Sequence, residues 1–268
     1  VIPLVKQNEG VHKASFLGLE RTVNGDKQLE DLEKSIRLAG YYPYRTTEAD
    51  VAEIGDDQIK IDRLFTSLML ETLGRWLAAA EERLEKLGIT CFITPGNDDK
   101  FEIDECFKNL RHVTNPEGRV VNIDASHTMI STGYSNMTPF GAPREVPEEF
   151  LFEKIDKMAR EIKDVSSCIF NLHCPPIDSG LDTCQQLDGT LKPVFKGGHP
   201  LMVGGGSVAV RQLIEKYQPL LGLHGHIHEC RNFARIGRTL CLNPGSEYSE
   251  GILKGAIIDL DQKGVKTY

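Results

Sequence analysis

Three histidines crowd into one short segment of the chain, "LLGLHGHIHEC" at residues 220–230. His224, His226 and His228 come after an apolar run, and Gly225 separates the first two. Residues i and i+2 of an extended backbone project to the same side, so His226 and His228 can reach one small volume or two adjacent metals. Imidazole nitrogens combined with oxygen donors suit Zn, Mn or Fe. The pattern therefore predicts metal-dependent chemistry at this segment.

Other polar clusters also come directly after strand-like runs. "ITCFIT" at 89–94 runs into "PGNDD", "VSSCIFNL" at 165–172 ends at His173, and "TLCL" is followed by "NPGS" at 243–246. In open α/β sheets the loops at the strand ends converge, while the sheet holds them rigid. We therefore expect these loops to meet in one crevice that gathers five candidate donors: Asn97, Asp98, His173, His226 and His228.

The elements that must position these side chains alternate along the chain. Apolar residues at helical spacing predict a helix over 60–88, with Gly88 as its C-terminal cap. Pro147 begins a second predicted helix, and Ser207 can cap a third. Strands are predicted at 89–94, 119–124, 165–172, 219–223 and 238–242, and a closing strand pair at 255–268. The alternation of strands and helices predicts the α/β class.

Composition narrows the function classes. The chain has 268 residues, 40% of them hydrophobic, and a net charge of −8, so bulk charge does not suggest a nucleic-acid groove, although a local one stays open. No apolar run reaches the ~18 residues of a membrane span, and no signal peptide is expected. The seven cysteines are scattered and never in Cys-x-x-Cys spacing, which favours a reducing cytoplasm over a disulfide framework.

Each candidate taken alone also has a structural interpretation. Asn97–Asp98 after Pro-Gly is a common surface turn, and a lone His173 is often a satisfied core residue. His224 lies on the strand side of the glycine and is interpreted as a supporting or core residue. Cys174 has a proline beside it and no cationic neighbour, so it is interpreted as structural. The remaining histidines outside the glycine-rich loop are interpreted as incidental: His12, His112 and His127.

One long glycine-containing loop is predicted over residues 177–206. Loops of this length are usually functional or disordered. The stretch "KGGHPLMVGGGS" within and after it lacks the spacing of a Walker phosphate loop. We expect the loop and "GYSN" at 133–136 to rim the crevice, with Asn136 and His199 as candidate substrate-binding residues.

The motifs in their order resemble the calcineurin-like metallophosphoesterase family. Where this chain has "GNDD" at 96–99, the family usually has Gly-Asn-His-Asp/Glu. "NLHCPP" is similar to the strand-ending histidine of the family, and "HGHIH" matches its Gly-His-x-His. "NPGS" resembles the segment that commonly follows, and the resemblance runs from about residue 89 to the C-terminus.

The resemblance implies a four-layer α/β/β/α sandwich with two divalent metal ions (Mn, Fe or Zn) between the loops of its sheets. Carried over position by position, one metal would be bound by Asn97, His173 and His226, and the other by His228. A hydroxide bridging the metals would attack the phosphorus of a phosphate mono- or diester in line. The candidate catalytic residues are Asp98 and His226.

The chain departs from the family pattern in two places. Asp98 stands where the family has a histidine near the leaving group, and a carboxylate could donate a proton there only with a raised pKa. We therefore expect Asp98 to orient Asn97 or a metal-bound water. The early Asp-x-His and Gly-Asp motifs are absent: Gly25–Asp26 is interpreted as a turn before a helix, and "DASH" at 124–127 has the wrong spacing.

A single phosphoesterase domain is accordingly expected over 1–268, without the N-terminal strand–helix–strand unit of the family; "VIPLV" at the start would follow the lost Gly-Asp loop. Two function classes stay open. One is a cytoplasmic metal-dependent phosphoesterase acting on a small phosphate ester, active when the missing ligands are present. The other is a non-catalytic binding or scaffold protein on the same fold with a degenerate metal site. The sequence indicates neither the substrate nor the oligomeric state.

Overall fold

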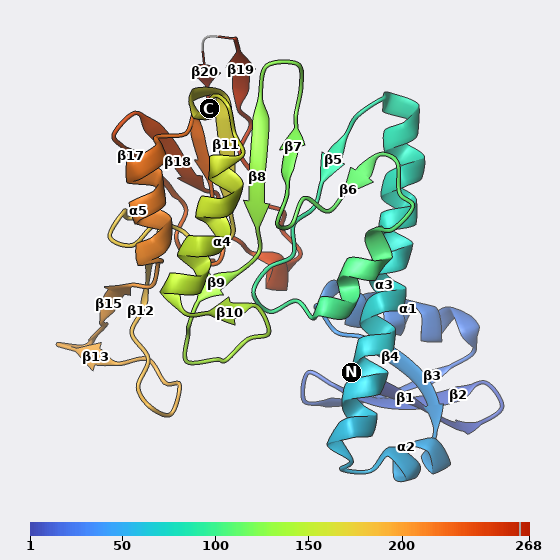
Figure 1. Cartoon of the computed structure of the whole chain (residues 1–268). Helices are drawn as coiled ribbons and strands as arrows, with labels where there is room; N and C mark the ends of the chain where they lie inside the picture. The colour runs from blue at the N-terminus through green and yellow to red at the C-terminus, as the bar shows by residue number, and fades with distance from the viewer. Residues whose placement is uncertain (263) are drawn as a thin grey trace. The chain divides into compact units, whose positions relative to one another are not determined.

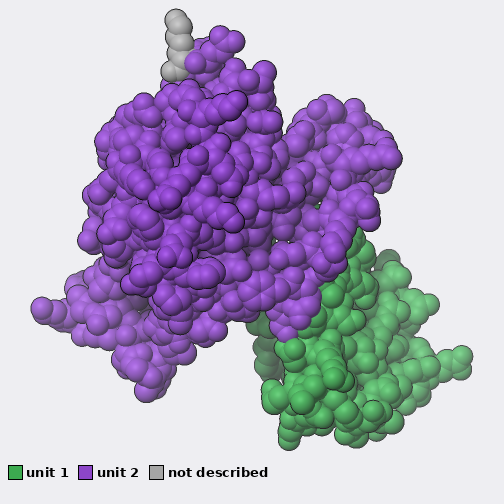
Figure 2. All heavy atoms as spheres, viewed as in Figure 1, with its two compact units in different colours: residues 1–80, 247–253 green, residues 81–246, 254–268 purple. Residues whose placement is uncertain are grey.

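The structure, a computed structural model, describes residues 1–262 and 264–268. Contacts within the chain divide it into two compact units, which Figure 2 distinguishes by colour: unit 1 comprises residues 1–80 and 247–253, and unit 2 comprises residues 81–246 and 254–268. The assignment of all 268 residues to one phosphoesterase domain stays a prediction. The α/β class is observed, since helices and several sheets alternate along the chain (Figure 1).

Unit 1 is built on a four-stranded sheet in the order β3-β2-β1-β4. Its strands and helices are β1 (Ile2–Asn8), β2 (Val11–Phe16), β3 (Leu19–Asn24), α1 (Asp26–Leu38), β4 (Pro43–Thr47) and α2 (Glu48–Ile54). The sheet and α1 share a small apolar core: Leu4, Ala14, Phe16, Leu29 and Ile36. Gly25 adopts φ 80° directly before α1, so Gly25–Asp26 is the turn before a helix that the sequence indicates.

The long helix α3 (Gln58–Leu87) agrees with the predicted helix over 60–88. Gly88 has φ 65°, and its N–H donates to the carbonyl of Glu85 while that of Ile89 donates to Leu84. These two hydrogen bonds form the glycine-terminated cap that the sequence predicts. In unit 2 the chain continues through β5 (Cys91–Phe92), which is parallel to β6 (Val113–Thr114).

The centre of unit 2 is a six-stranded sheet in the order β17-β18-β16-β11-β8-β7. Its strands are β7 (Val120–Asn122), β8 (Thr128–Thr132), β11 (Cys168–Leu172), β16 (Leu221–Leu223), β17 (Asn232–Ile236) and β18 (Thr239–Asn243). The four central strands β18, β16, β11 and β8 are mutually parallel, and the two edge strands are antiparallel to their neighbours. The loops after the four parallel strands therefore emerge at one edge of the sheet.

Alternation along the strands separates two apolar faces. Ile130 and Phe170 belong to the core formed with α4 (Glu148–Arg160) and α5 (Val208–Tyr217). Their neighbours Met129 and Ile169 belong to a second cluster on the other face, together with Leu260 and Val265 of the C-terminal hairpin. In Figure 1 both helices lie across the same face of this sheet.

The central strand β8 is missing from the sequence-based prediction, which places a strand only at 119–124. "TMIST" is a five-residue strand in which polar and apolar residues do not alternate, and it follows the turn at "DASH". The predicted closing strand pair is observed as β19 (Asp259–Asp261) and β20 (Gly264–Thr267), and Lys263 lies outside the described residues.

The prediction of one long glycine-containing loop without strands over 177–206 needs correction. The segment folds back on itself as two antiparallel pairs, β12 (Thr183–Gln185) with β15 (Met202–Gly204) and β13 (Phe195–Lys196) with β14 (His199–Pro200). We call residues 177–206 the arm. Its base is fixed by the buried carboxylate of Asp182, which accepts hydrogen bonds from the N–H groups of Asp178 and Gly206. Strands of two or three residues within a glycine-rich segment carry too little periodicity to be recognised from sequence.

Candidate functional site

Three of the predicted donors meet at the carboxyl edge of the central sheet. Nε2 of His173 lies 3.0 Å from Oδ1 of Asn97, and Nδ1 of His226 lies 3.1 Å from the same oxygen. The two imidazole rings are edge to face, with centroids 5.2 Å apart. Donors bound to one metal at about 2.1 Å, with angles of about 90–109°, are separated by roughly 3.0–3.4 Å. The nitrogen–oxygen distances therefore match those expected around a shared cation.

The backbone that presents His226 is not extended, which corrects the geometry assumed from sequence. β16 ends at Leu223, and His226 adopts the left-handed conformation with φ 64°. The N–H of Ile227 donates to the carbonyl of Gly225 at 2.7 Å, which closes a tight turn. The projection of His226 and His228 to one side therefore does not follow from strand alternation. Non-glycine residues at positive φ are uncommon and are concentrated at functional sites.

Asn243 holds this turn from the end of β18. Its buried side-chain amide donates to the carbonyls of Gly225 and Ile227, at 3.1 and 3.0 Å, and to that of Leu181 in the arm at 3.1 Å. The N–H of Ser246 donates to the carbonyl of His228. The "NPGS" segment therefore positions the histidine turn, which is a role that the sequence motif alone did not assign.

The two converging histidines are neutral at pH 7. Burial lowers the pKa of His173 to about 3, and the neighbouring His226 and His228 act in the same direction. Burial also lowers the pKa of His226, although the carboxylate of Glu145 opposes this shift. Cations compete with protons for imidazole lone pairs, so rings that resist protonation keep these lone pairs available.

Asn97 is oriented by a carboxylate that the sequence did not indicate. Its Nδ2 donates to Oε1 of Glu145 at 3.3 Å, so its Oδ1 faces the two imidazoles. Its backbone carbonyl accepts a hydrogen bond from the N–H of Arg144 at 3.0 Å. Asp98, which was expected to orient Asn97 or a metal-bound water, is exposed, and among the described residues its side chain has no hydrogen-bond partner. Its role in orienting Asn97 is therefore not supported by the geometry.

His228 lies at the edge of the cluster. It is exposed, and its electrostatic interaction lowers the pKa values of both His173 and His226. Within residues 1–262 and 264–268, no group of three or more His, Cys, Asp and Glu side chains is placed to hold a metal ion. The first metal would thus depend on the amide oxygen of Asn97 as the third donor, beside two imidazole nitrogens. This mixed set fits Zn, Mn or Fe.

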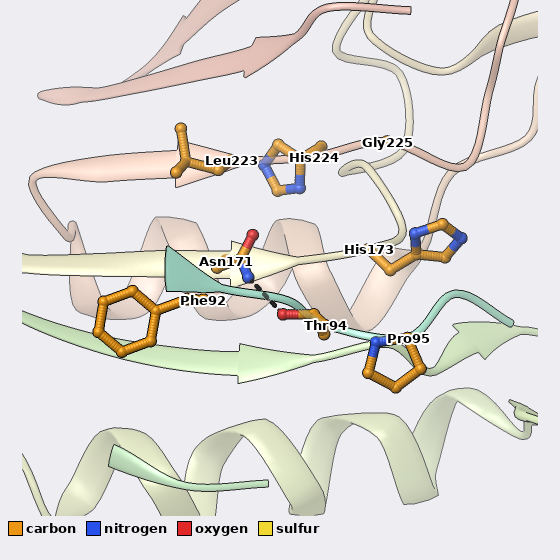
Figure 3. A pocket seen from close by; sticks show the side chains of 8 residues that line it. All are labelled: Phe92, Thr94, Pro95, Asn171, His173, Leu223, His224 and Gly225. Atoms are coloured by element: carbon orange, nitrogen blue, oxygen red, sulfur yellow. Dashed lines mark hydrogen bonds between the residues drawn. The ribbon is translucent and has the colours of Figure 1, made fainter. Parts of the chain in front are cut away.

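A polar cavity of about 230 Å³ adjoins His173. Figure 3 shows the hydrogen bond from Asn171 to Thr94 that crosses from β11 to the chain after β5. His224 lines the same cavity; its Nδ1 lies 2.9 Å from the carbonyl of Leu172 and 3.1 Å from that of Cys174. Burial lowers the pKa of His224 to about 4. This arrangement ties the ends of β11 and β16 together, which fits the interpretation of His224 as a supporting residue.

The two predicted substrate-binding residues are placed differently. Asn136 accepts a hydrogen bond from the thiol of the buried Cys174 at 2.9 Å and donates to the carbonyl of Gly206 at 3.5 Å. Asn136 therefore contacts Cys174, the residue after His173, and also adjoins the base of the arm. His199 is exposed in β14, and no hydrogen bond joins it to the histidine cluster among the described residues.

Comparison with known proteins shows that one solved structure shares the fold. No family model matches the chain. The uncharacterized protein MJ1162 of Methanocaldococcus jannaschii is 29% identical over 153 residues, which cover 56% of this chain and only 61% of that relative. One solved crystal structure is 18% identical, with a TM-score of 0.51 over 82% of this chain and 85% of the other. The crystal structure of TT1561 of Thermus thermophilus is 20% identical, with a TM-score of 0.46 over 66% and 72% of the two chains.

Proposed function

We propose that this chain carries the centre of a metal-dependent phosphoesterase of the calcineurin-like type, which hydrolyses a small phosphate mono- or diester. The observation that carries the proposal is the convergence of His173 Nε2 and His226 Nδ1 on Asn97 Oδ1. Both imidazoles are neutral at pH 7 because burial lowers their pKa values. A nitrogen–nitrogen–oxygen donor set of this kind suits a divalent transition metal.

Asn97, His173 and His226 would hold one ion, and His228 would contribute to a second. Divalent Mn, Fe or Zn would supply the positive charge that polarises the phosphoryl group. The chain's own task is then to keep the donors fixed and neutral. The resemblance implies that the remaining donors come from an Asp-x-His and a Gly-Asp segment.

The finer architecture belongs to the same proposal. We infer a four-layer α/β/β/α sandwich in which α4 and α5 form one outer layer on the six-stranded sheet. The net charge of −8 supports a small phosphate ester over a long nucleic acid. No helix among the described residues is both long and apolar enough to cross a membrane. Action in the cytoplasm without a membrane partner is part of the proposal.

The arm and the "GYSN" segment would select the substrate. Asn136 supports this assignment, because it lies between Cys174, the neighbour of His173, and the base of the arm at Gly206. Shortening the arm between β12 and β15 is expected to change the preference among phosphate esters while the bound metal stays the same. Equal loss of metal and activity would indicate a structural role for the arm instead.

Metal binding is the primary test. Calorimetric titration of the 268-residue chain with Mn²⁺ or Zn²⁺ is expected to show at least one bound ion, and His226→Ala should weaken binding by about 100-fold or more. His112→Ala is the matched control, since His112 lies outside the cluster. Hydrolysis of an aryl phosphate with both early motifs present would establish the enzyme. Binding without hydrolysis under those conditions would favour the non-catalytic alternative, and absence of binding would contradict the metal site itself.

A further inference from the structure

We propose that Glu145 is a positioning residue of this site, whose carboxylate fixes the amide of Asn97 so that Oδ1 faces His173 and His226. The inference rests on the proposed function, because it concerns how a metal ligand is oriented. Glu145 does not contact the converging nitrogens itself. It acts through Asn97, by a hydrogen bond from Nδ2 at 3.3 Å.

The surroundings of Glu145 require a carboxylate. Oε1 accepts hydrogen bonds from Asn97 Nδ2 and from the Thr138 hydroxyl at 2.5 Å, and Oε2 accepts one from the Thr138 N–H at 2.9 Å. Both oxygens are thus acceptors of N–H donors. A glutamine side chain has only one accepting end, so it would turn its own NH₂ group toward either Thr138 or Asn97.

The orientation of the Asn97 amide decides what it offers the imidazoles. An asparagine side chain has an accepting oxygen at one end and a donating NH₂ group at the other. While Nδ2 is committed to Glu145, the oxygen must face His173 and His226, as the distances of 3.0 and 3.1 Å show. Without that commitment, rotation by about 180° would aim NH₂ at the position of the cation and remove one of its ligands.

The segment that carries Glu145 is itself held against the "PGNDD" loop. Arg144 is almost completely buried; its N–H donates to the carbonyl of Asn97 at 3.0 Å and its Nε donates to that of Asp99 at 2.9 Å. Backbone and side-chain contacts from two consecutive residues thus converge on one loop. The geometry assigns to Glu145 the orienting of Asn97, which is one of the two roles expected for Asp98.

The first test measures Mn²⁺ affinity by calorimetry. Glu145→Gln is expected to weaken binding by about 10- to 100-fold, the usual effect of removing an outer-shell partner of a ligand. Glu149→Gln is the matched control, because it removes the same charge from an exposed position in the first turn of α4, and its affinity should stay unchanged. In an Asn97→Ala background, Glu145→Gln should have no further effect. A full additional loss in that background would overturn the proposal.

A second readout needs no metal. The side-chain NH₂ signals of Asn97, identified in ¹H–¹⁵N spectra by their loss in Asn97→Ala, should move in Glu145→Gln and stay in place in Glu149→Gln. Unmoved signals in Glu145→Gln would overturn the role of Glu145. If the wild-type chain binds no Mn²⁺ while the Asn97 signals still respond to Glu145→Gln, the proposed function fails and the orienting contact stands.

Discussion

The two sides of the candidate site are held by different kinds of structure. His173 and His226 follow β11 and β16, two inner strands of the six-stranded sheet. Asn97 follows β5, a strand of two residues that is paired with β6 in a two-stranded sheet. The histidine side therefore takes its position from strand pairing and from the turn that Asn243 holds. The Asn97 side takes it from contacts with a segment more than 40 residues further along the chain, at Arg144 and Glu145.

This difference predicts different consequences of mutation on the two sides. On the histidine side, the N–H of His173 donates to the carbonyl of Thr132, and that of Gly225 donates to the carbonyl of His173, so the site continues the backbone ladder of the sheet. Damage there should lower the free energy of unfolding together with metal affinity. On the Asn97 side, single side chains set the geometry, so affinity should fall with little change in stability.

The largest effect is expected where the two sides touch, at Gly133. A Cβ atom on Gly133 would lie 2.0 Å from the carbonyl oxygen of Pro95, which is backbone and cannot move aside cheaply. Gly133→Ala should therefore lower the free energy of unfolding by about 3 kcal/mol or more and displace the "PGNDD" loop. Urea denaturation measures the change. Gly189→Ala, which meets nothing within 4 Å, is the control. Equal stability of the two variants would contradict the close approach.

The next effect concerns the turn on the histidine side. Asn243→Ala removes the donor that serves the carbonyls of Gly225, Ile227 and Leu181. Leaving buried carbonyls without a partner should cost about 2–3 kcal/mol, and Mn²⁺ affinity should fall in parallel because the turn carries His226. Denaturation and calorimetry on the same preparation test the link, with the exposed Asn122→Ala as control. If Mn²⁺ affinity fell while stability did not, stability and affinity would not be linked on the histidine side, and the difference between the two sides would be contradicted.

A pH-dependent effect on stability should come from Asp156 in α4, which packs with α5 on the six-stranded sheet. Hydrogen bonding from Lys216 lowers the pKa of the buried Asp156 below its ordinary 3.8, and Tyr217 and Arg160 act in the same direction. The ionised form is thus favoured by folding, so its contribution is present above about pH 4 and is lost as pH falls through the folded pKa.

Asp156→Asn should consequently cost about 1–2 kcal/mol at pH 7. The difference from the wild-type protein should shrink steadily as pH falls below about 4 and through the folded pKa, because the wild-type carboxyl then also becomes neutral. Thermal or urea unfolding at a series of pH values measures it. Glu153→Gln, an exposed change on the same helix, should show no such trend. A difference that stays constant with pH would mean that packing, and not charge, is responsible.

More of the histidine side than of the Asn97 side could be predicted from the sequence, because strand pairing leaves a local pattern and contacts between distant residues do not. Strand periodicity and short motifs are local, so the strands at 165–172 and 219–223 and the histidines after them were predictable. The strand "TMIST" was missed because a five-residue run with mixed polarity carries a weak signal. Glu145 gave no signal, since its contact with Asn97 joins residues 48 positions apart. The left-handed turn at His226 was likewise not encoded by any residue pattern.

The smallest effect is expected at Asp98. Its side chain is exposed and has no hydrogen-bond partner among the described residues, so Asp98→Asn should change stability by less than about 0.5 kcal/mol and leave Mn²⁺ affinity unchanged.

The role of Asp98 also bears on which leaving groups the proposed enzyme can expel. If Asp98 is not a proton donor, the active enzyme should hydrolyse aryl esters far better than alkyl ones, because alkoxide leaving groups need the ~10²–10⁴-fold help of a general acid. Rates measured against leaving-group pKa should then fall on parallel lines for the wild-type protein and Asp98→Asn. A selective loss on alkyl esters by orders of magnitude, with aryl esters spared, would instead make Asp98 a general acid and would place a working catalytic group on the Asn97 side of the site.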